Sequence, residues 1–193
     1  MTPYVLVLYY SRHGSVLNLA RAIAKGVESS GIEAKIRTVA DFDSERELPY
    51  PLVTLDDLMH CHGLAFGSPC RFGLMASPLK SFWEQTSNSW IKGDLIDTPA
   101  CVFTSSSSLH GGNEATLLSM ALPLLHHGMM LLGVPYSEPG LLSTNKGGTP
   151  YGPSHVSGLN SNMELSADEK AICFSMGQRL GRTALVLQKN SPS

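Results

Sequence analysis

The sequence predicts an α/β fold, a single domain built on a doubly wound parallel sheet of five strands with helices on both faces. Three observations lead to this prediction. Segments with strand character and segments with helix character alternate five times along the 193 residues, which is the order expected of a parallel sheet. Several strand segments are apolar without alternation, as in strands covered on both faces. The chain also has the length of one domain, and no segment has the composition of a linker.

The first strand is expected at residues 4–10, which are rich in β-branched and aromatic side chains. A polar loop at residues 11–15 follows it. The next segment has the periodicity of an amphipathic helix that ends at Ser30-Gly31. Its apolar face is formed by Leu17, Ala20, Ile23, Ala24 and Val27.

The middle of the chain supplies the second and third strands. Residues 34–39 alternate between apolar and polar side chains, as a strand does. Residues 63–67 form a short buried strand that ends at Ser68-Pro69. A helix is expected over residues 77–86, and another apolar strand over residues 100–104.

The last third of the chain continues the alternation. Gly112 or Asn113 can cap a helix through Leu125, and a fifth strand is expected at residues 129–134. Residues 135–165 contain five glycines and four prolines and no convincing element. A segment of that length is usually functional or disordered, and its turn sequences favour an ordered excursion within the domain. The final helix is expected to open at residues 166–169 with a capping box.

Charge and composition exclude several classes of function. Lys and Arg number 14 against 16 Asp and Glu, a formal net charge of -2, which offers no electrostatic footprint for nucleic acid or for an anionic membrane. The longest apolar run, at residues 4–10, is far shorter than the roughly 20 residues of a membrane span, and it lacks the flanks of a signal peptide. Four widely spaced cysteines without a C-x-x-C pair indicate the reducing cytoplasm.

Three unusual loops follow the first, third and fourth predicted strands. In an open parallel sheet, ligands bind beyond the carboxyl ends of the strands, so these loops are expected at one edge. The first loop, residues 11–15, joins a strand to a helix with one glycine and two serines. Such a turn directs backbone N–H groups and a helix N-terminus toward an anion, so a phosphate is the ligand expected there. An ordinary helix-capping turn is the alternative interpretation.

Known nucleotide motifs narrow the choice of ligand. Neither the P-loop pattern G-x-x-x-x-G-K-[ST] nor the dinucleotide pattern G-x-G-x-x-G occurs. The loops at residues 68–75 and 104–113 combine hydrogen-bond donors, glycines and apolar or aromatic side chains, which suits a flat heterocycle. One phosphate and one ring system fit a mononucleotide such as FMN better than a dinucleotide.

Four segments carry a resemblance to a known family. They are residues 6–11 (LVLYYS), 68–73 (SPCRFG), 125–129 (LHHGM) and 147–152 (GGTPYG). Together, and over almost the whole chain, they resemble the WrbA-type NAD(P)H:quinone oxidoreductases. The resemblance implies a flavodoxin-like fold with strand order 2-1-3-4-5, bound FMN, and a homotetramer (a dimer of dimers) whose subunits complete one another's pockets.

The resemblance also implies a role for each loop. The FMN phosphate would be held by Ser11, Arg12, His13, Gly14, Ser15 and Val16. The isoalloxazine ring would be bordered by Cys70, Arg71, Phe72 and Gly73. The ribityl chain and ring would also be contacted by Ser105, Ser106, Ser107, Ser108, Leu109, His110, Gly111 and Gly112. Trp90 and Phe72 would stack on the quinone, and His126, a flavin-site histidine in the family, would polarise or protonate the quinone oxygen.

The chain departs from the family pattern at several positions. Val16 stands where flavodoxins usually have threonine, Cys70 where many family members have threonine, and Leu74 where they have asparagine. The third loop is one residue longer than the shorter family form. Residues 40–53 lack most of an insertion that longer members carry, which bears on the details of assembly.

Other candidate sites are weaker. Residues 60–62 (His-Cys-His) could be metal ligands, but no partner at metal spacing follows, so no metal is expected. His126 and His127 point about 100° apart on a helix and cannot share one ligand; one can face a site while the other is solvated or at an interface. A redox role for Cys70 is open, because no basic neighbour can be named.

These observations predict a cytoplasmic enzyme that uses FMN and either NADH or NADPH to reduce quinones by two electrons, with ping-pong hydride transfer. The main alternative is a flavodoxin-like carrier of single electrons. Such carriers tend to be strongly acidic, and they lack a long segment comparable to residues 135–165 beside the site. An FMN reductase acting on azo or nitroaromatic acceptors and a flavin-free scaffold are further alternatives. The natural quinone and the choice between NADH and NADPH are open.

Charged residues make up only 16% of the chain, against about 25% in an average soluble domain. Buried strands account for part of the difference. Another part is residues 117–130, which carry no Asp, Glu, Lys or Arg on any face of the predicted helix. A helix that is apolar all round must be buried, so we expect that the protein is not a monomer.

Overall fold

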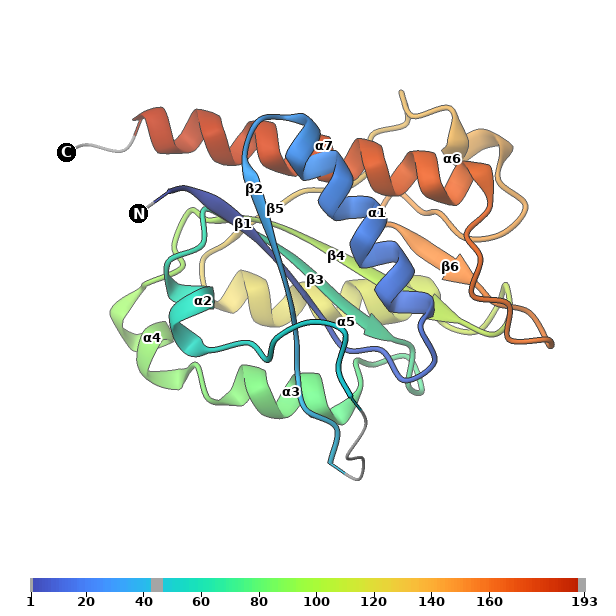
Figure 1. Ribbon diagram of the computed structural model, residues 1–193, viewed down its shortest axis with the longest axis horizontal. Coiled ribbons are helices and arrows are strands. Elements are labelled where there is room, and N and C mark those ends of the chain that lie inside the picture. Colours follow the sequence, from blue (N-terminus) through green and yellow to red (C-terminus); the bar gives the residue numbers. More distant parts are fainter. Residues whose placement is uncertain (1, 43–46, 191–193) are drawn as a thin grey trace.

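The computed structural model describes residues 2–42 and 47–190. A parallel sheet lies between two layers of helices (Figure 1). Its strands are β1 (Tyr4–Tyr9), β2 (Glu33–Thr38), β3 (Gly63–Pro69), β4 (Pro99–Ser106), β5 (Met130–Leu131) and β6 (Ser154–Val156). The order β2-β1-β3-β4-β5, with every pair parallel, confirms the predicted doubly wound sheet.

Helices cover both faces of the sheet (Figure 1). One face packs on α1 (Ser15–Ser29) and α7 (Ala167–Asn190), and the other packs on α2 (Leu55–Met59), α3 (Ser77–Glu84) and α5 (Asn113–His126). The position of β1 in the sheet explains why apolar and polar residues do not alternate in its sequence. Leu6 and Leu8 enter one core while Val5 and Val7 enter the other, so every residue of the strand is buried.

Two short strands share the outer edge of β4, where the sequence predicts a single strand over residues 129–134. Only Met130–Leu131 pair there, opposite Pro99 and Ala100. The chain then leaves the sheet, and the N–H of Val134 donates to the carbonyl of Pro150 at 2.9 Å. Further along the same edge, β6 pairs with residues 104–106 of β4. The prediction of a full fifth strand is therefore wrong in extent, because residues distant in sequence take the rest of the edge.

The excursion at residues 135–165 contains more regular structure than its sequence indicates. It includes the short helix α6 (Gly140–Ser143) as well as β6. Neither has a local pattern, because each has only three or four residues and is stabilised by partners distant in sequence. Helices α2 and α4 (Ser87–Lys92) are not among the elements predicted from the sequence.

Helix α7 begins where the sequence predicts. The amide of Glu169 donates to Ser166 Oγ at 3.2 Å, and the amide of Ser166 donates to Glu169 Oε2 at 2.7 Å, which completes the capping box. Further along, α7 crosses α1 at glycines of both helices. A Cβ on Gly177 would overlap the carbonyl of Ile23, and a Cβ on Gly26 would overlap that of Phe174. The two backbones are thus in direct contact.

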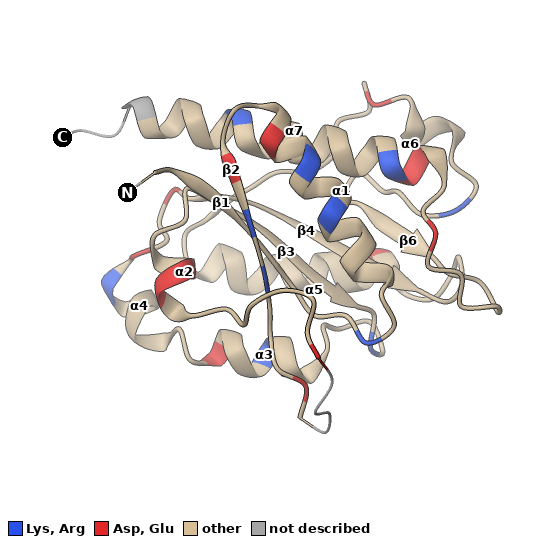
Figure 2. Ribbon diagram, in the orientation of Figure 1, with Lys and Arg blue, Asp and Glu red and all other residues tan. Residues whose placement is uncertain are grey.

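Charges are sparse and lie mainly on helices, loops and the edge strand β2, whereas the central strands carry none (Figure 2). In the part of the chain that the structure describes, no helix combines the length and the apolar character needed to cross a membrane.

Candidate cofactor cleft

A cleft at the carboxyl ends of β1, β3 and β4 unites the three predicted loops. Its volume is about 360 Å³. The predicted residues that line it are Ser11, Arg12, His13, Ser15, Val16, Cys70, Arg71, Phe72, Ser105, Ser106, Ser107 and Gly111. The loops converge because parallel strands place their carboxyl ends at one edge, where open α/β sheets bind ligands.

The first loop leads directly into α1. Gly14 is the N-cap residue and has a φ of 99°, a left-handed conformation that glycine adopts without strain. Its N–H donates to Ser11 Oγ at 3.1 Å, which closes the turn. Helix α1 has no side-chain cap and no acidic residue in its first turn, so the start of the helix favours an anion.

The lining of the cleft is positive. Arg12 and His13 come from the first loop and Arg71 from the second, and none of the described residues that line the cleft is acidic. Serine hydroxyls from the third loop add neutral donors. This combination suits a phosphate and a polyhydroxyl chain.

Phe72 lies at the rim of the cleft on a tight turn. The backbone groups of Arg71 and Leu74 exchange hydrogen bonds of 2.9 and 3.0 Å around it. Phe72 itself has a φ of 55° and is fully exposed. A non-glycine residue in this left-handed region is under strain, and the turn holds an aromatic ring where it can stack on a flat ligand.

Cys70 fastens the second loop to the third. Its thiol donates to the carbonyl of Gly111 at 3.0 Å, and a Cβ on Gly112 would lie 3.3 Å from its Sγ. Gly112 is the N-cap of α5 and has a φ of 90°. The contacts of Cys70 are thus those of a hydrogen-bond donor that holds two loops together.

Several predicted residues do not line the cleft although they belong to its loops. They are Gly14, Gly73, Ser108, Leu109, His110 and Gly112. Gly14 and Gly112 start helices α1 and α5, whereas Leu109 and His110 are exposed.

Trp90 and His126 lie together but away from the cleft. The indole N–H of Trp90 donates to the backbone carbonyl of His126 at 2.8 Å, and both residues line a separate hollow of about 390 Å³. Helix α5 starts beside the cleft at Gly112 and ends at His126. Its 14 residues span about 20 Å at about 1.5 Å each, so one chain does not bring these two side chains to its own cleft.

The side chains of His126 and His127 lie in different environments, as their adjacent positions on a helix predict. His126 is exposed, whereas His127 is buried, with its Nε2 2.9 Å from Thr86 Oγ1 and its ring edge against Trp83. Burial, reinforced by the charge of His126, lowers the pKa of His127. His127 is therefore a neutral core residue.

Residues 60–62, the weak metal-ligand candidates, lie between α2 and β3. Cys61 is buried, and desolvation raises the pKa of its thiol to about 12. Over residues 2–42 and 47–190, no cluster of three or more His, Cys, Asp or Glu side chains could hold a metal ion.

Sequence reasoning missed three lining residues, Pro69, Ser157 and Ser161. Ser157 reaches the cleft because it follows β6, which pairs with the end of β4. The N–H of Ser157 donates to the carbonyl of Ser106 at 3.0 Å. The two serines are 51 residues apart in the chain, so no local pattern links them. The only sequence signal was that the excursion is too long for a simple connection.

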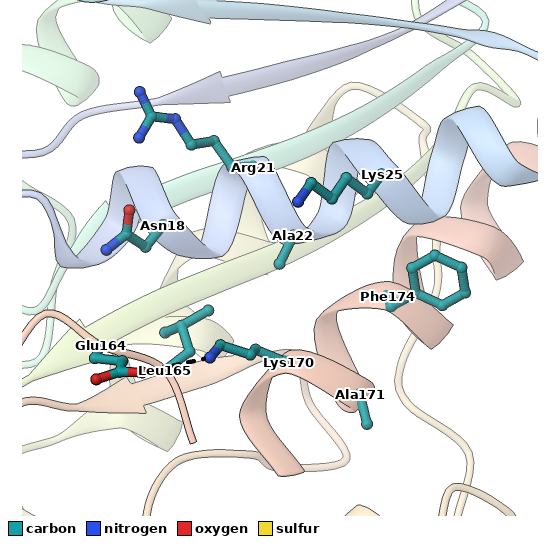
Figure 3. Close-up of a pocket in the computed structure, with 9 residues that line it drawn as sticks. All are labelled: Asn18, Arg21, Ala22, Lys25, Glu164, Leu165, Lys170, Ala171 and Phe174. Atoms are coloured by element: carbon teal, nitrogen blue, oxygen red, sulfur yellow. Dashed lines mark ion pairs between the residues drawn. The ribbon is translucent and has the colours of Figure 1, made fainter. Parts of the chain in front are cut away.

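A larger hollow lies elsewhere, between α1 and α7, with a volume of about 540 Å³ (Figure 3). Arg21 at its rim is bound to Tyr50, with its Nε 3.3 Å from the phenol oxygen. Lys170 lies 3.7 Å from Glu164 (Figure 3). None of the three loops lines this hollow. The smaller cleft at the strand ends is the better candidate for a cofactor.

Residues 3–137 match the family described as NADPH-dependent FMN reductase. A Sinorhizobium fredii protein named NAD(P)H dehydrogenase (quinone) is 36% identical over 95% of this chain and 98% of its own length. A protein of the same name from Gluconacetobacter diazotrophicus gives the same identity and coverage.

Solved structures show the same architecture. The flavodoxin, WrbA-like protein from Agrobacterium tumefaciens has a TM-score of 0.69 at 21% identity, covering 98% of this chain and 100% of that one. A flavodoxin from the domain Archaea has a TM-score of 0.65 at 16% identity, covering 94% and 99% of the two chains. The predicted flavodoxin-like fold and the sequence resemblance are both confirmed, and the chain belongs to the NADPH-dependent FMN reductase family.

Proposed function

We propose that this protein binds FMN and reduces quinones by two electrons with NADH or NADPH as the donor. The observation that carries the proposal is the positive cleft formed by three loops at the carboxyl ends of β1, β3 and β4. Family membership and relatives named NAD(P)H dehydrogenase (quinone) support it. When bound, FMN supplies the ring that exchanges a hydride with nicotinamide and quinone.

The residues of the cleft fit the parts of FMN. The first loop and the start of α1 would hold the phosphate, with Arg12 adding positive charge and His13 lying beside it. Serines 105–107 would donate to the ribityl hydroxyls. Arg71 and the neighbouring backbone amides would stabilise negative charge at the polar edge of the ring, and Phe72 would stack against a flat partner.

Assembly is the second part of the proposal. Leu118, Leu122 and Leu125 on α5 are 50%, 59% and 53% exposed, an apolar stripe that a second copy of the chain would cover. We place Trp90 and His126 of one subunit at the cleft of another, since they lie at the far end of α5 from their own cleft. A tetramer of this kind would let Trp90 stack on the quinone and His126 polarise its oxygen.

The compartment we propose is the cytoplasm. All four cysteines are free, and Cys61, Cys101 and Cys173 are buried, which accords with a reducing environment.

Reconstitution with FMN tests the catalytic proposal. The purified protein should quench FMN fluorescence at one site per chain and oxidise NADH or NADPH with benzoquinone. Parallel double-reciprocal plots at several quinone concentrations would support alternate use of one site by the two substrates. A protein that binds no FMN, or that binds it without turning over either nicotinamide, would contradict the proposal, and the latter outcome would favour an electron carrier.

A mixing experiment tests whether the site is shared. One variant, Trp90→Ala with His126→Ala, should keep an intact cleft; a second, Arg12→Ala with Phe72→Ala, should keep the distant pair. Each variant alone should be nearly inactive. After dissociation and joint reassembly, about a quarter of the sites should be intact by random pairing, and activity should recover accordingly. No recovery from properly assembled mixtures would show that each chain works alone.

A further inference from the structure

A fully buried histidine and glutamate fasten the excursion to α7. His155 lies on β6, and Glu169 lies in the first turn of α7; their side chains are 1% and 0% exposed. The Nδ1 of His155 is 3.1 Å from both carboxylate oxygens of Glu169. Its Nε2 is 2.8 Å from the backbone carbonyl of Asn162.

The partners of His155 fix the protonation of its ring. A carboxylate and a carbonyl can only accept hydrogen bonds, so both ring nitrogens must donate. A neutral imidazole has one proton, and its bare nitrogen would face the lone pairs of an acceptor. With Glu169 ionised, the geometry therefore favours the imidazolium. Burial opposes this charge, but the hydrogen bonds to Glu169 and Asn162 outweigh it and raise the pKa of His155.

Glu169 also accepts hydrogen bonds from the backbone. It accepts from the backbone N–H groups of Gly147 at 2.9 Å, Val156 at 3.2 Å and Ser166 at 2.7 Å. Burial disfavours the carboxylate, yet these bonds and the imidazolium hold the pKa of Glu169 well below its usual range. The pair is thus a satisfied buried ion pair, which is costly to break from one side.

Asn162 belongs to a segment that borders the cofactor cleft, which we call the cover segment (residues 157–163). Ser157 and Ser161 of this segment line the cleft. Its last residue, Met163, lies against Gly14, where an added Cβ would be 2.7 Å from the Met163 Sδ. The carbonyl of Met163 also accepts from Asn18 Nδ2 at 2.9 Å. The cover segment therefore packs directly on the phosphate loop.

We propose that His155 is a positioning residue whose protonated ring holds the cover segment against the phosphate loop, an arrangement we call the clasp. One proton on this ring therefore controls how firmly the cleft holds its phosphate-bearing ligand. When the ring loses a proton, the remaining proton stays on Nδ1, beside the carboxylate. The bare Nε2 then repels the carbonyl of Asn162, and the cover segment is released from that point. This inference rests on the proposed function only in taking FMN as the ligand.

The charged and titratable groups around the pair come from several elements. Lys146, in the excursion, opposes protonation of His155 by its charge. Cys173 on α7 and Cys101 on β4 are fully buried, and desolvation raises their thiol pKa values, so both are neutral near pH 7. Glu164 and Lys170 pair with each other beyond the cover segment.

The first test uses the protein without FMN, and so does not depend on the proposed function. Nitrogen NMR of the histidine rings should show both nitrogens of His155 protonated at pH 6. As the pH rises, the amide signals of Ser161, Asn162 and Met163 should shift with the same midpoint as the ring. A bare ring nitrogen at pH 6, or cover-segment signals that ignore the ring's titration, would overturn the proposal.

The second test measures FMN affinity by fluorescence quenching between pH 5 and 9 in the wild type and in His155→Gln. Above the midpoint of His155, the wild-type Kd should rise more steeply than that of the variant, by up to tenfold per pH unit for one linked proton. Titration of the FMN phosphate occurs in both proteins and cancels in the comparison.

Two further variants sharpen the second test. His60→Gln removes an exposed histidine paired with Asp56 and should leave the wild-type pH profile unchanged. Glu169→Gln keeps the shape of the side chain but removes its charge, and should move the midpoint to lower pH. If His155→Gln does not fold, this shift replaces it as the deciding result. Superimposable pH profiles for wild type and either clasp variant would contradict the clasp, whereas absence of FMN binding at every pH would contradict only the proposed function.

Discussion

The residues that shape the cofactor cleft differ in how far the sequence reveals them. Ser11, Arg71 and Ser105 could be placed because each follows an apolar strand, and parallel strands gather such loops at one edge. Ser157 and Ser161 could not, because their position depends on a strand pairing between distant parts of the chain. The contacts of His155 could not be predicted either, since its two partners, Glu169 and Asn162, are brought to it by tertiary packing.

At Gly14 two constraints coincide, which makes its substitution informative. Gly14→Ala places a Cβ in a left-handed conformation and against the Met163 sulfur, so we expect a stability loss of about 1 kcal/mol or more and weaker FMN binding. Gly31→Ala is the matched control, because Gly31 has a similar φ of 89° and nothing within 4 Å of the added Cβ.

Urea unfolding and FMN titration of both glycine variants check this expectation. Gly31→Ala should lose comparable stability from backbone strain but retain the wild-type FMN affinity. Equal FMN affinity in Gly14→Ala and wild type would show that the cover segment and phosphate loop do not act together on the ligand.

Among elements, the central strands and long helices follow from local patterns, but the outer edge of the sheet does not. Residues 4–10 are apolar on both faces because both faces are covered, and α7 starts at its capping box. The segment at residues 129–134 has the composition of a strand, yet only two of its residues pair. Which segment occupies a parallel edge depends on non-local competition: β6 pairs with residues 104–106 of β4, whereas β5 pairs only with Pro99 and Ala100.

The crossing of α1 and α7 predicts a reversed glycine effect. Gly→Ala usually stabilises a helix by about 1 kcal/mol, but in Gly177→Ala the Cβ would overlap the rigid backbone of Ile23. Overpacking of this kind costs about 1–3 kcal/mol. Gly181→Ala, one turn later, meets the movable Ser30 hydroxyl first and should cost clearly less. Urea unfolding of the two variants checks the difference, and equal losses would argue against close backbone contact at Gly177.

The His155–Glu169 pair also predicts a pH dependence of stability. The pKa of Glu169 is lowered from 4.5 on folding, so its contribution is complete above pH 4.5 and is lost as the pH falls through the lowered value. The pKa of His155 is raised from 6.5, so its contribution is complete below pH 6.5 and is lost as the pH rises through the raised value. The pair therefore stabilises most between pH 4.5 and 6.5.

The free energy of unfolding of wild type minus that of His155→Gln isolates this effect. Burial lowers the pKa values of His62 and His127, but both residues are present in the two proteins, so their contributions cancel. The difference should be largest in the window between pH 4.5 and 6.5 and shrink on the alkaline side. A difference that grows above pH 7 would contradict a charged His155.

On the scale of the whole molecule, the low charge content has a structural origin. Both faces of the sheet are covered, and the described part of α5 beyond its first turn carries no acidic or basic side chain except His126. Three leucines on that helix nevertheless remain about half exposed in the single chain. The sequence predicts that such a helix needs a partner, but it does not say which surface of the partner covers it.

Introducing positive charge into the apolar stripe tests the assembly. Leu118→Lys with Leu122→Lys should reduce the mass measured by light scattering without unfolding the chain, because both side chains are half exposed. Activity should fall in parallel if the site is shared. Leu142→Lys alters an exposed leucine on α6 and should leave the mass unchanged. An unchanged mass in the α5 variant would place the interface elsewhere.

Strands β5 and β6 share one border of the sheet. This division also affects how copies of the protein can associate. A long, flat border strand invites foreign strands to add to it and is the usual starting point of fibrous aggregation. Here one border is split into pieces of two and three residues, and the opposite border, β2, carries Glu33, Lys35 and Arg37. Neither border is a good template for strand addition, which leaves the helical faces as the surfaces suited to ordered self-association.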